Sequence, residues 1–148
     1  MARNLFDYGN FISHSGKELN WKIECEALND DDWNCLAHMI LEFNSIPFQY
    51  AVGIPRGGVK LGDILDKYGT RNENDPVLIV DDVMTTGNSF EEFKQRHIAL
   101  RAKEHRYMGW CVFSRSPLVN DDDTWIRALF TMPGPLDEVI DVTNRSFI

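Results

Sequence analysis

Apolar residues along the chain recur at two spacings, which predict alternating helices and strands. Apolar side chains recur every three or four positions over 33–43 and 61–68, which is typical of helices with one buried face. A third helix is expected from Asn88 to about Ala102. Five shorter apolar or alternating runs predict strands at Trp21–Cys25, Phe48–Ile54, Val77–Val80, Tyr107–Phe113 and Trp125–Phe130. The rest of residues 1–28 is expected to be mostly loop.

Capping and turn residues bound the helices. Asn29 or Asp30 can cap the first helix, which Pro47 ends, and Gly69 stops the second. The uninterrupted run Val77–Val80 is typical of a strand buried on both faces of a parallel sheet. Strands that alternate with helices imply right-handed crossovers. The pattern therefore predicts an α/β fold with a parallel sheet and helices on both of its faces.

Composition and charge narrow the class of protein. The chain has 148 residues, of which 43% are hydrophobic, and this suits one globular domain over 1–148. No run is long and apolar enough for a membrane helix, and the start does not resemble a secretory signal. The net charge of −8 argues against binding to duplex DNA or to an anionic membrane. We therefore expect no nucleic-acid partner and no membrane partner.

The cysteines indicate the compartment. Cys25, Cys35 and Cys111 are an odd number without metal-binding spacing. They are expected to be buried, reduced thiols in a cytoplasmic protein.

The segment VLIVDDVMTTGNS, residues 77–89, carries the most informative chemistry. A buried strand brings Asp81 and Asp82 to its carboxyl end, and a turn that opens a helix follows. Gly87 can adopt a positive φ, and the hydroxyls and helix N-terminus complete a cradle for one phosphate group. The carboxylates can accept ribose hydroxyls directly or through hydrated Mg²⁺. The alternative is an ordinary strand-to-helix turn with a capping box from Ser89 to Glu92.

A second glycine-bearing turn, Pro55–Gly58, leaves the preceding strand. Gly57 and Gly58 let backbone N–H groups approach a ligand, and Arg56 offers a planar fork for phosphate oxygens. Alone, this turn could be a plain loop. Its position lets it face the Asp81–Gly87 loop across a cleft at the carboxyl ends of the strands.

These segments resemble a known family. VLIVDDVMTTGNS resembles the phosphoribosyl-diphosphate (PRPP) signature of type I phosphoribosyltransferases, and GIPRGG resembles that family's pyrophosphate loop. The run FISHSGK, followed by WKI, is similar to the hood of orotate phosphoribosyltransferases. The resemblance covers roughly residues 8–116. It implies the Rossmann-like type I phosphoribosyltransferase fold, with a small hood in residues 1–28 of the single domain.

The resemblance also implies roles for individual residues. Asp81 and Asp82 would be catalytic and hold the ribose hydroxyls, with Mg²⁺ as cofactor, held through pyrophosphate and ribose. The base would lie near His14, Lys17 and Arg115. The phosphate and pyrophosphate groups would be held by Thr85, Thr86, Gly87, Asn88 and Ser89, and by Pro55, Arg56, Gly57 and Gly58, respectively. A homodimer is also implied.

The implied reaction transfers ribose 5-phosphate from PRPP to a nitrogenous base. Purine-type members place an acid where this chain has Thr85, which favours a pyrimidine-like base. Only Thr70–Pro76 separates Gly69 from Val77, too few residues for the family's additional strand and flexible catalytic loop. Residues 114–124 could cover the cleft instead. The alternative is a regulatory protein that binds PRPP or a nucleotide without turnover.

Overall fold

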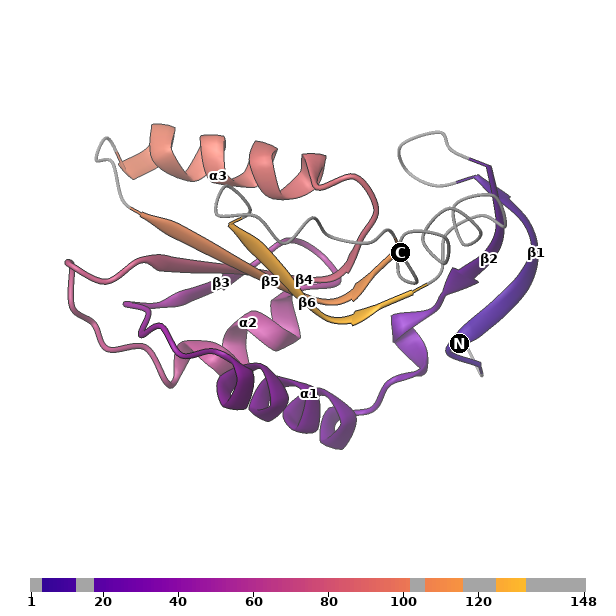
Figure 1. The fold of residues 1–148 in the computed structure, drawn as a ribbon, viewed down its shortest axis with the longest axis horizontal. Coiled ribbons are helices and arrows are strands. Elements are labelled where there is room, and N and C mark those ends of the chain that lie inside the picture. Colours follow the sequence, from indigo (N-terminus) through magenta and orange to yellow (C-terminus); the bar gives the residue numbers. More distant parts are fainter. Residues whose placement is uncertain (1–3, 13–17, 102–105, 116–124, 133–148) are drawn as a thin grey trace, which may run out of the picture.

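Four parallel strands form the centre of the computed structural model, which describes residues 4–12, 18–101, 106–115 and 125–132 (Figure 1). The strands lie in the order β3–β4–β5–β6. Their bounds are Ala51–Gly53, Val77–Met84, Tyr107–Ser114 and Ile126–Thr131. The predicted parallel sheet is therefore confirmed.

Helices cover both faces of this sheet, as the sequence predicts. Helices α1 (Asp30–Phe43) and α2 (Val59–Asp66) lie on one side, and α3 (Asn88–Arg101) lies on the other (Figure 1). Asn29 caps α1 through a reciprocal pair of hydrogen bonds with Asp32, each 2.9 Å long. None of the helices in the described ranges is long and apolar enough to cross a bilayer.

Strand β4 contributes buried residues to two hydrophobic cores, one on each face of the sheet. Leu78 and Val80 pack with residues of α1 and α2, whereas Ile79 packs with Phe90 of α3. All three are fully buried, which confirms the prediction for this strand. The predicted loop at Asp81–Gly87 is wrong in its first half, because β4 continues to pair with β5 as far as Met84 and Ser114.

The predicted strand Phe48–Ile54 is reduced to the three residues of β3. Residues just before β3 form backbone hydrogen bonds with the turn that follows α2. Thr70 donates its N–H to the Phe48 carbonyl at 2.8 Å, and Arg71 donates to the Gln49 carbonyl at 2.9 Å. Residues 67–76 contain neither helix nor strand. The short separation correctly predicts that Thr70–Pro76 adds no further strand, whereas the second helix ends at Asp66 and not at the predicted Tyr68.

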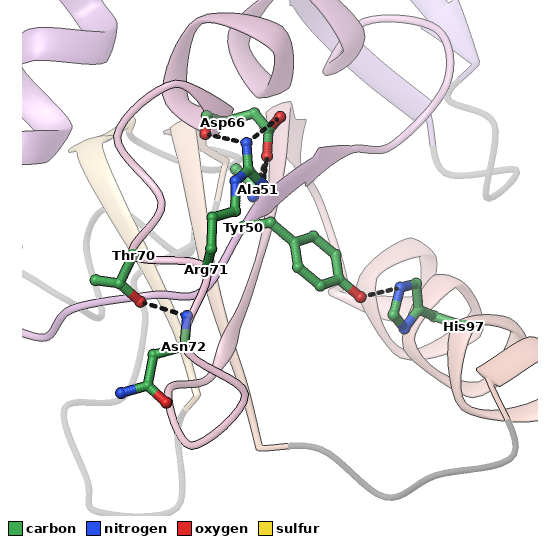
Figure 2. A network of polar contacts seen from close by, with 7 residues as sticks. All are labelled: Tyr50, Ala51, Asp66, Thr70, Arg71, Asn72 and His97. Atoms are coloured by element: carbon green, nitrogen blue, oxygen red, sulfur yellow. Dashed lines mark hydrogen bonds and ion pairs between the residues drawn. The ribbon is translucent and has the colours of Figure 1, made fainter.

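Asp66 completes this closure of the β3 edge (Figure 2). Its Oδ1 accepts the Ala51 N–H at 3.1 Å, and both carboxylate oxygens accept from the Arg71 guanidinium at 3.0 Å. In the same view, Tyr50 Oη lies 3.0 Å from His97 Nε2 and joins the strand to α3. The Asp66 side chain and the 67–76 turn therefore form the hydrogen bonds to the backbone at and before β3 that a neighbouring strand would otherwise form.

An N-terminal hairpin forms a second, two-stranded sheet beside the parallel sheet (Figure 1). It consists of antiparallel β1 (Phe6–Ile12) and β2 (Glu18–Ile23), and a 3₁₀ turn at Cys25–Ala27 follows. The prediction of loop before Trp21 is wrong. The register shifts between Tyr8 and Phe11, and this irregularity breaks the alternation that sequence reading depends on. The Phe6 ring packs edge-on against the ring of Phe113, near the carboxyl end of β5, with 6.3 Å between the ring centroids.

The cysteines correct a further prediction. All three are free thiols, but only Cys111 is buried, whereas Cys25 is half-buried and Cys35 is exposed. Cys35 lies on the exposed side of α1, whose buried residues are Trp33, Ala37 and Ile40.

Candidate functional site

Two loops follow the carboxyl ends of β3 and β4. We call Pro55–Gly58 the glycine loop and Thr85–Ser89 the threonine loop. A Cβ atom added to Gly57 would overlap the Asp82 carboxylate, which would have to turn away, and one on Gly58 would overlap the Val80 carbonyl oxygen. At Gly58, where the neighbour is backbone, only glycine permits this approach. The structure thus brings the glycine loop against the carboxylates of β4.

The two adjacent carboxylates differ in burial. Asp81 is 9% exposed, and its Oδ1 accepts the Asp82 N–H at 2.9 Å, while Asp82 is half-buried and accepts the Val83 N–H at 2.7 Å. Burial, with the nearby negative charge of Asp82, raises the pKa of Asp81 to about 8. The pair is therefore poised to gain from a cation or from donor groups that a ligand would supply.

Cysteines flank these carboxylates, which the sequence analysis does not anticipate. The thiol of Cys25, in the turn that joins the hairpin to α1, lies near Asp82. Burial and the charge of Asp82 raise the pKa of Cys25. Cys111 lies opposite Asp81 in the β4–β5 register, and burial raises its pKa also. The alignment of the predicted strands could have placed Cys111, but no sequence signal places Cys25, which is 57 positions from Asp82.

The threonine loop has the conformation expected of an anion cradle. Gly87 has φ of +85°, where an L side chain would be strained even though space remains around it. Thr86 Oγ1 accepts the Asn88 N–H at 3.3 Å. Because α3 begins at Asn88, Ser89 lies within its first turn, where N–H groups have no intrahelical acceptor. This corrects the alternative in which Ser89 caps the helix from outside.

The glycine loop presents its own polar groups to solvent. Pro55, Arg56 and Gly57 are exposed, whereas Gly58 is buried and donates its N–H to the Ile54 carbonyl at 2.9 Å. The peptide bond between Pro55 and Arg56 is cis. The exposed guanidinium of Arg56 is therefore placed on the loop that abuts Asp82.

The expected base-binding residues are only partly placed. Arg115 follows β5 and donates its N–H to the Met84 carbonyl at 2.9 Å, so it lies beside the end of β4. Its side chain is 7% exposed, and burial lowers its pKa. His14 and Lys17 fall outside the described residues, as do 116–124, which make up most of the segment 114–124 expected to replace the lid.

The carboxylates of Asp81 and Asp82 suit a magnesium ion that keeps most of its water or phosphate ligands. Among the described residues, no three His, Cys, Asp or Glu side chains gather in a metal-binding cluster. Asp81 and Asp82 offer two neighbouring carboxylates. Mg²⁺ is commonly bound by one or two carboxylates together with water and phosphate oxygens. These two aspartates therefore fit a shared site with a phosphorylated ligand.

Comparisons with known proteins find likeness at the level of structure. No protein-family model matches the sequence, and no curated protein matches it. The structure resembles orotate phosphoribosyltransferase from Aeropyrum pernix, with TM-score 0.65 and 18% identity, over 96% of this chain and 95% of that chain. It resembles the Mycobacterium tuberculosis orotate phosphoribosyltransferase solved with inorganic phosphate, with TM-score 0.59 and 16% identity, over 84% and 87% of the two chains.

A larger protein contains the same fold as one part. The likeness to Leishmania donovani UMP synthase has TM-score 0.64 and 16% identity, and covers 97% of this chain. This chain spans 36% of the length of that synthase. At these identities the likeness concerns the arrangement of the backbone. We conclude that the chain has the fold of the type I phosphoribosyltransferases, including those named for orotate.

Proposed function

We propose that this protein is a cytoplasmic phosphoribosyltransferase that binds PRPP with Mg²⁺ at the carboxyl ends of β3 and β4. The observation that carries the proposal is the contact between Gly57 and Asp82. It joins a loop suited to pyrophosphate with carboxylates suited to ribose hydroxyls. Structures with the same fold that are named orotate phosphoribosyltransferases support the reading.

Each part of the site has a distinct task in this proposal. The threonine loop and the first turn of α3 bind the 5-phosphate through backbone N–H groups and hydroxyls. Asp81 and Asp82 accept the ribose 2- and 3-hydroxyls. Arg56 and the backbone of the glycine loop bind pyrophosphate. When bound, Mg²⁺ would neutralise charge on the departing pyrophosphate.

The proposed reaction exchanges two bonds at the anomeric carbon of ribose. A nitrogen of the base forms a bond to that carbon, while its bond to the pyrophosphate oxygen breaks. Positive charge develops on the sugar, and negative charge on Asp81 and Asp82 would stabilise it once the bound ligand and Mg²⁺ favour the ionised form of Asp81. Thr85 cannot protonate or deprotonate a base at neutral pH. We therefore propose a pyrimidine-like base that ionises without an acid at this position.

A second candidate function is binding without turnover. The observation that favours it is the closed β3 edge, where the 67–76 turn and the Asp66–Arg71 pair stand in place of another strand and a lid. A lid excludes water and completes a catalytic site. A PRPP- or nucleotide-binding regulatory protein would keep the two loops and need no lid.

A turnover assay separates these candidates. The protein is incubated with PRPP, Mg²⁺ and, in turn, orotate, uracil and the purine bases, and base-dependent pyrophosphate release is measured. The transferase proposal expects release with a pyrimidine base and its loss in Asp82→Asn. Bound PRPP with no release for any base would favour the regulatory protein. A folded protein that binds no PRPP would overturn the transferase proposal, and one that binds neither PRPP nor a nucleotide would overturn both.

We also propose a homodimer, on the resemblance to phosphoribosyltransferases. Sedimentation equilibrium should give about twice the 17.1 kDa mass of one chain. A single species of 17.1 kDa at all concentrations would contradict it.

A further inference from the structure

The side of α3 that faces the sheet changes from apolar to polar along the helix. All 14 residues of α3 are described, and Phe90 is the only buried one. Phe93 is half-buried and packs against the same core. The same side then carries Lys94, His97 and Arg101, at helical spacings of three and four. Burial of apolar side chains therefore holds only the first half of α3 against the sheet.

Two cations in the second half of α3 lie over aromatic rings. Lys94 Nζ is 4.9 Å from the centroid of the Trp125 ring and 5.9 Å from that of Tyr107. The Arg101 guanidinium is 5.4 Å from the centroid of the Tyr50 ring. Lysine and arginine side chains have many rotamers, so these contacts alone do not fix the helix at one position on the sheet.

His97 makes the directional contact between α3 and the sheet. Its Nε2 lies 3.0 Å from Tyr50 Oη (Figure 2), and its Nδ1 lies 2.7 Å from Tyr107 Oη. In either neutral tautomer, one ring nitrogen donates to a phenol and the other accepts from a phenol. Tyr50 directly precedes β3, and its carbonyl accepts the Leu78 N–H at 3.0 Å. Tyr107 begins β5 and pairs with Val77. The imidazole therefore joins α3 to both strands that flank β4, at the amino end of β4.

Phe90 and His97 attach α3 at two separate points. They are seven residues apart in the sequence, which corresponds to about two turns, or about 10 Å, along the helix axis. Phe90 packs with Ile79 of β4. A helix attached only at Phe90 is free to tilt about that point, and its first turn, which begins at Asn88, would then move relative to Asp81. Attachment at both points keeps α3 aligned with β4.

We propose that His97 is a positioning residue for the 5-phosphate site. By binding Tyr50 and Tyr107, it keeps α3 in line with β4. The first turn of α3 then presents its N–H groups to a phosphate whose ribose reaches Asp81 and Asp82. His97 itself touches no ligand, because it lies at the amino end of β4 and the carboxylates lie toward the other end. The inference rests on the proposed function, which makes this turn and the threonine loop the phosphate site.

Two partial ligands separate this role from a general loss of stability. Ribose 5-phosphate would occupy the threonine loop and the carboxylates, whereas pyrophosphate with Mg²⁺ would occupy the glycine loop. Calorimetric titration of the whole protein measures both affinities and that of PRPP. His97→Phe keeps a ring and removes both nitrogens. We expect it to weaken ribose 5-phosphate and PRPP about tenfold and to leave the affinity for Mg²⁺ and pyrophosphate unchanged.

The double variant Tyr50→Phe/Tyr107→Phe tests the same hydrogen bonds from the other side, because it removes both hydroxyls and keeps both rings. It should weaken ribose 5-phosphate as much as His97→Phe does. Adding His97→Phe to the double variant should cause no further loss, since the bonds it would break are already absent.

Two control variants should leave all of these affinities unchanged. Asp66→Ala removes hydrogen bonds at the outer edge of β3 and so lowers stability away from α3. Gln95→Ala changes an exposed residue of α3 itself.

The outcomes distinguish this inference from the proposed function. If the wild type binds PRPP and folded His97→Phe keeps its affinity for ribose 5-phosphate, or loses affinity for both partial ligands equally, the positioning role is overturned and the proposed function stands. If His97→Phe does not fold, the tyrosine double variant decides by the same criterion. A folded wild type that binds neither PRPP nor ribose 5-phosphate would overturn the proposed function and this inference together.

Discussion

Asp66, the last residue of α2, and Asp81, on the inner strand β4, both lie beside the parallel sheet's strands, and their surroundings shift their pKa values in opposite directions. Asp66 receives hydrogen bonds from Arg71 and from the Ala51 N–H, and the Arg71 bonds hold its pKa below the usual range. Asp81 is buried beside a second carboxylate, which raises its pKa. The first carboxylate has its partners within the protein, whereas the second lacks a cationic partner in the described part of the chain.

This difference separates a structural region from a functional one. The Asp66 region closes the outer edge of β3, so removal of the Asp66 carboxylate should weaken the fold and leave ligand binding unchanged. At the carboxyl end of β4, ionised carboxylates are costly in the free protein and become favourable when a ligand supplies opposing groups. Removal of the charge on Asp81 and Asp82 should abolish ligand binding and leave the fold as stable as the wild type or more stable.

The largest expected effect is on the pH dependence of stability through Asp81. Between its ordinary pKa of 3.8 and about 8, the folded protein holds a proton on Asp81 that the unfolded chain releases. Stability from this group is therefore complete below pH 3.8 and is lost as pH rises to about 8. The loss should be on the order of a few kcal/mol.

Asp81→Asn should remove this loss, because an amide does not ionise and its oxygen can still accept the Asp82 N–H. Urea denaturation at several values of pH between 5 and 8 measures the effect. The gap in unfolding free energy between the variant and the wild type should widen in favour of the variant as pH rises. A constant gap would contradict the assigned environment of Asp81.

The second effect concerns PRPP affinity and the glycine loop. Gly57→Ala places a methyl group where the Asp82 carboxylate lies, so the carboxylate must turn away from its position. We expect PRPP to bind about 30-fold more weakly, or about 2 kcal/mol, because one ribose acceptor is displaced. Calorimetric titration measures this affinity.

Val59→Ala is the matched control for that substitution, since Val59 follows the glycine loop and is 40% exposed. It should leave PRPP affinity unchanged. Equal affinities for wild type and Gly57→Ala would mean that the contact between this loop and Asp82 has no part in binding.

A smaller effect is expected at the β3 edge. Asp66→Ala leaves the Ala51 N–H and the Arg71 guanidinium without their acceptor, which should lower stability by about 1 kcal/mol. PRPP affinity should stay within error of the wild type. Asp63→Ala, an exposed aspartate on the same helix, is the control for both measurements. A weakened affinity in Asp66→Ala would show that the two regions are coupled.

The smallest effect is expected from Cys25→Ala. The Cys25 thiol lies near Asp82 and a thiol is at most a weak donor, so its removal should change PRPP affinity by less than about threefold and stability by less than about 1 kcal/mol. Cys35→Ala, on the exposed side of α1, should have no effect. A loss as large as that of Gly57→Ala would make Cys25 a principal positioning residue.

Regular elements with strong local patterns could be predicted from the sequence, while elements set by their neighbours could not. The run Val77–Val80 and the capped helix after Asn29 carry their own signals, and both were predicted correctly. The length of β3 depends on whether its outer edge meets a strand or the 67–76 turn, and no local pattern records that choice. The bulged pairing in the hairpin likewise obscured β1.

The site divides in the same way. The positive φ of Gly87 and the approach of the glycine loop to Asp82 follow from residue types and the placement of loops at strand ends. The proximity of Cys25 to Asp82 arises from tertiary packing alone. The roles of the site residues stay predictions, and those of His14 and Lys17 concern residues outside the described ranges.

Calorimetric titration of PRPP with Mg²⁺ tests the central claim most directly. It compares the wild type with the double variant Asp81→Asn/Asp82→Asn, after denaturation curves have shown that both are folded. The account predicts saturable binding to the wild type and none to the variant. A folded wild type that binds no PRPP, or a variant that binds equally well, would contradict the claim that these carboxylates and loops form one ribose-phosphate site.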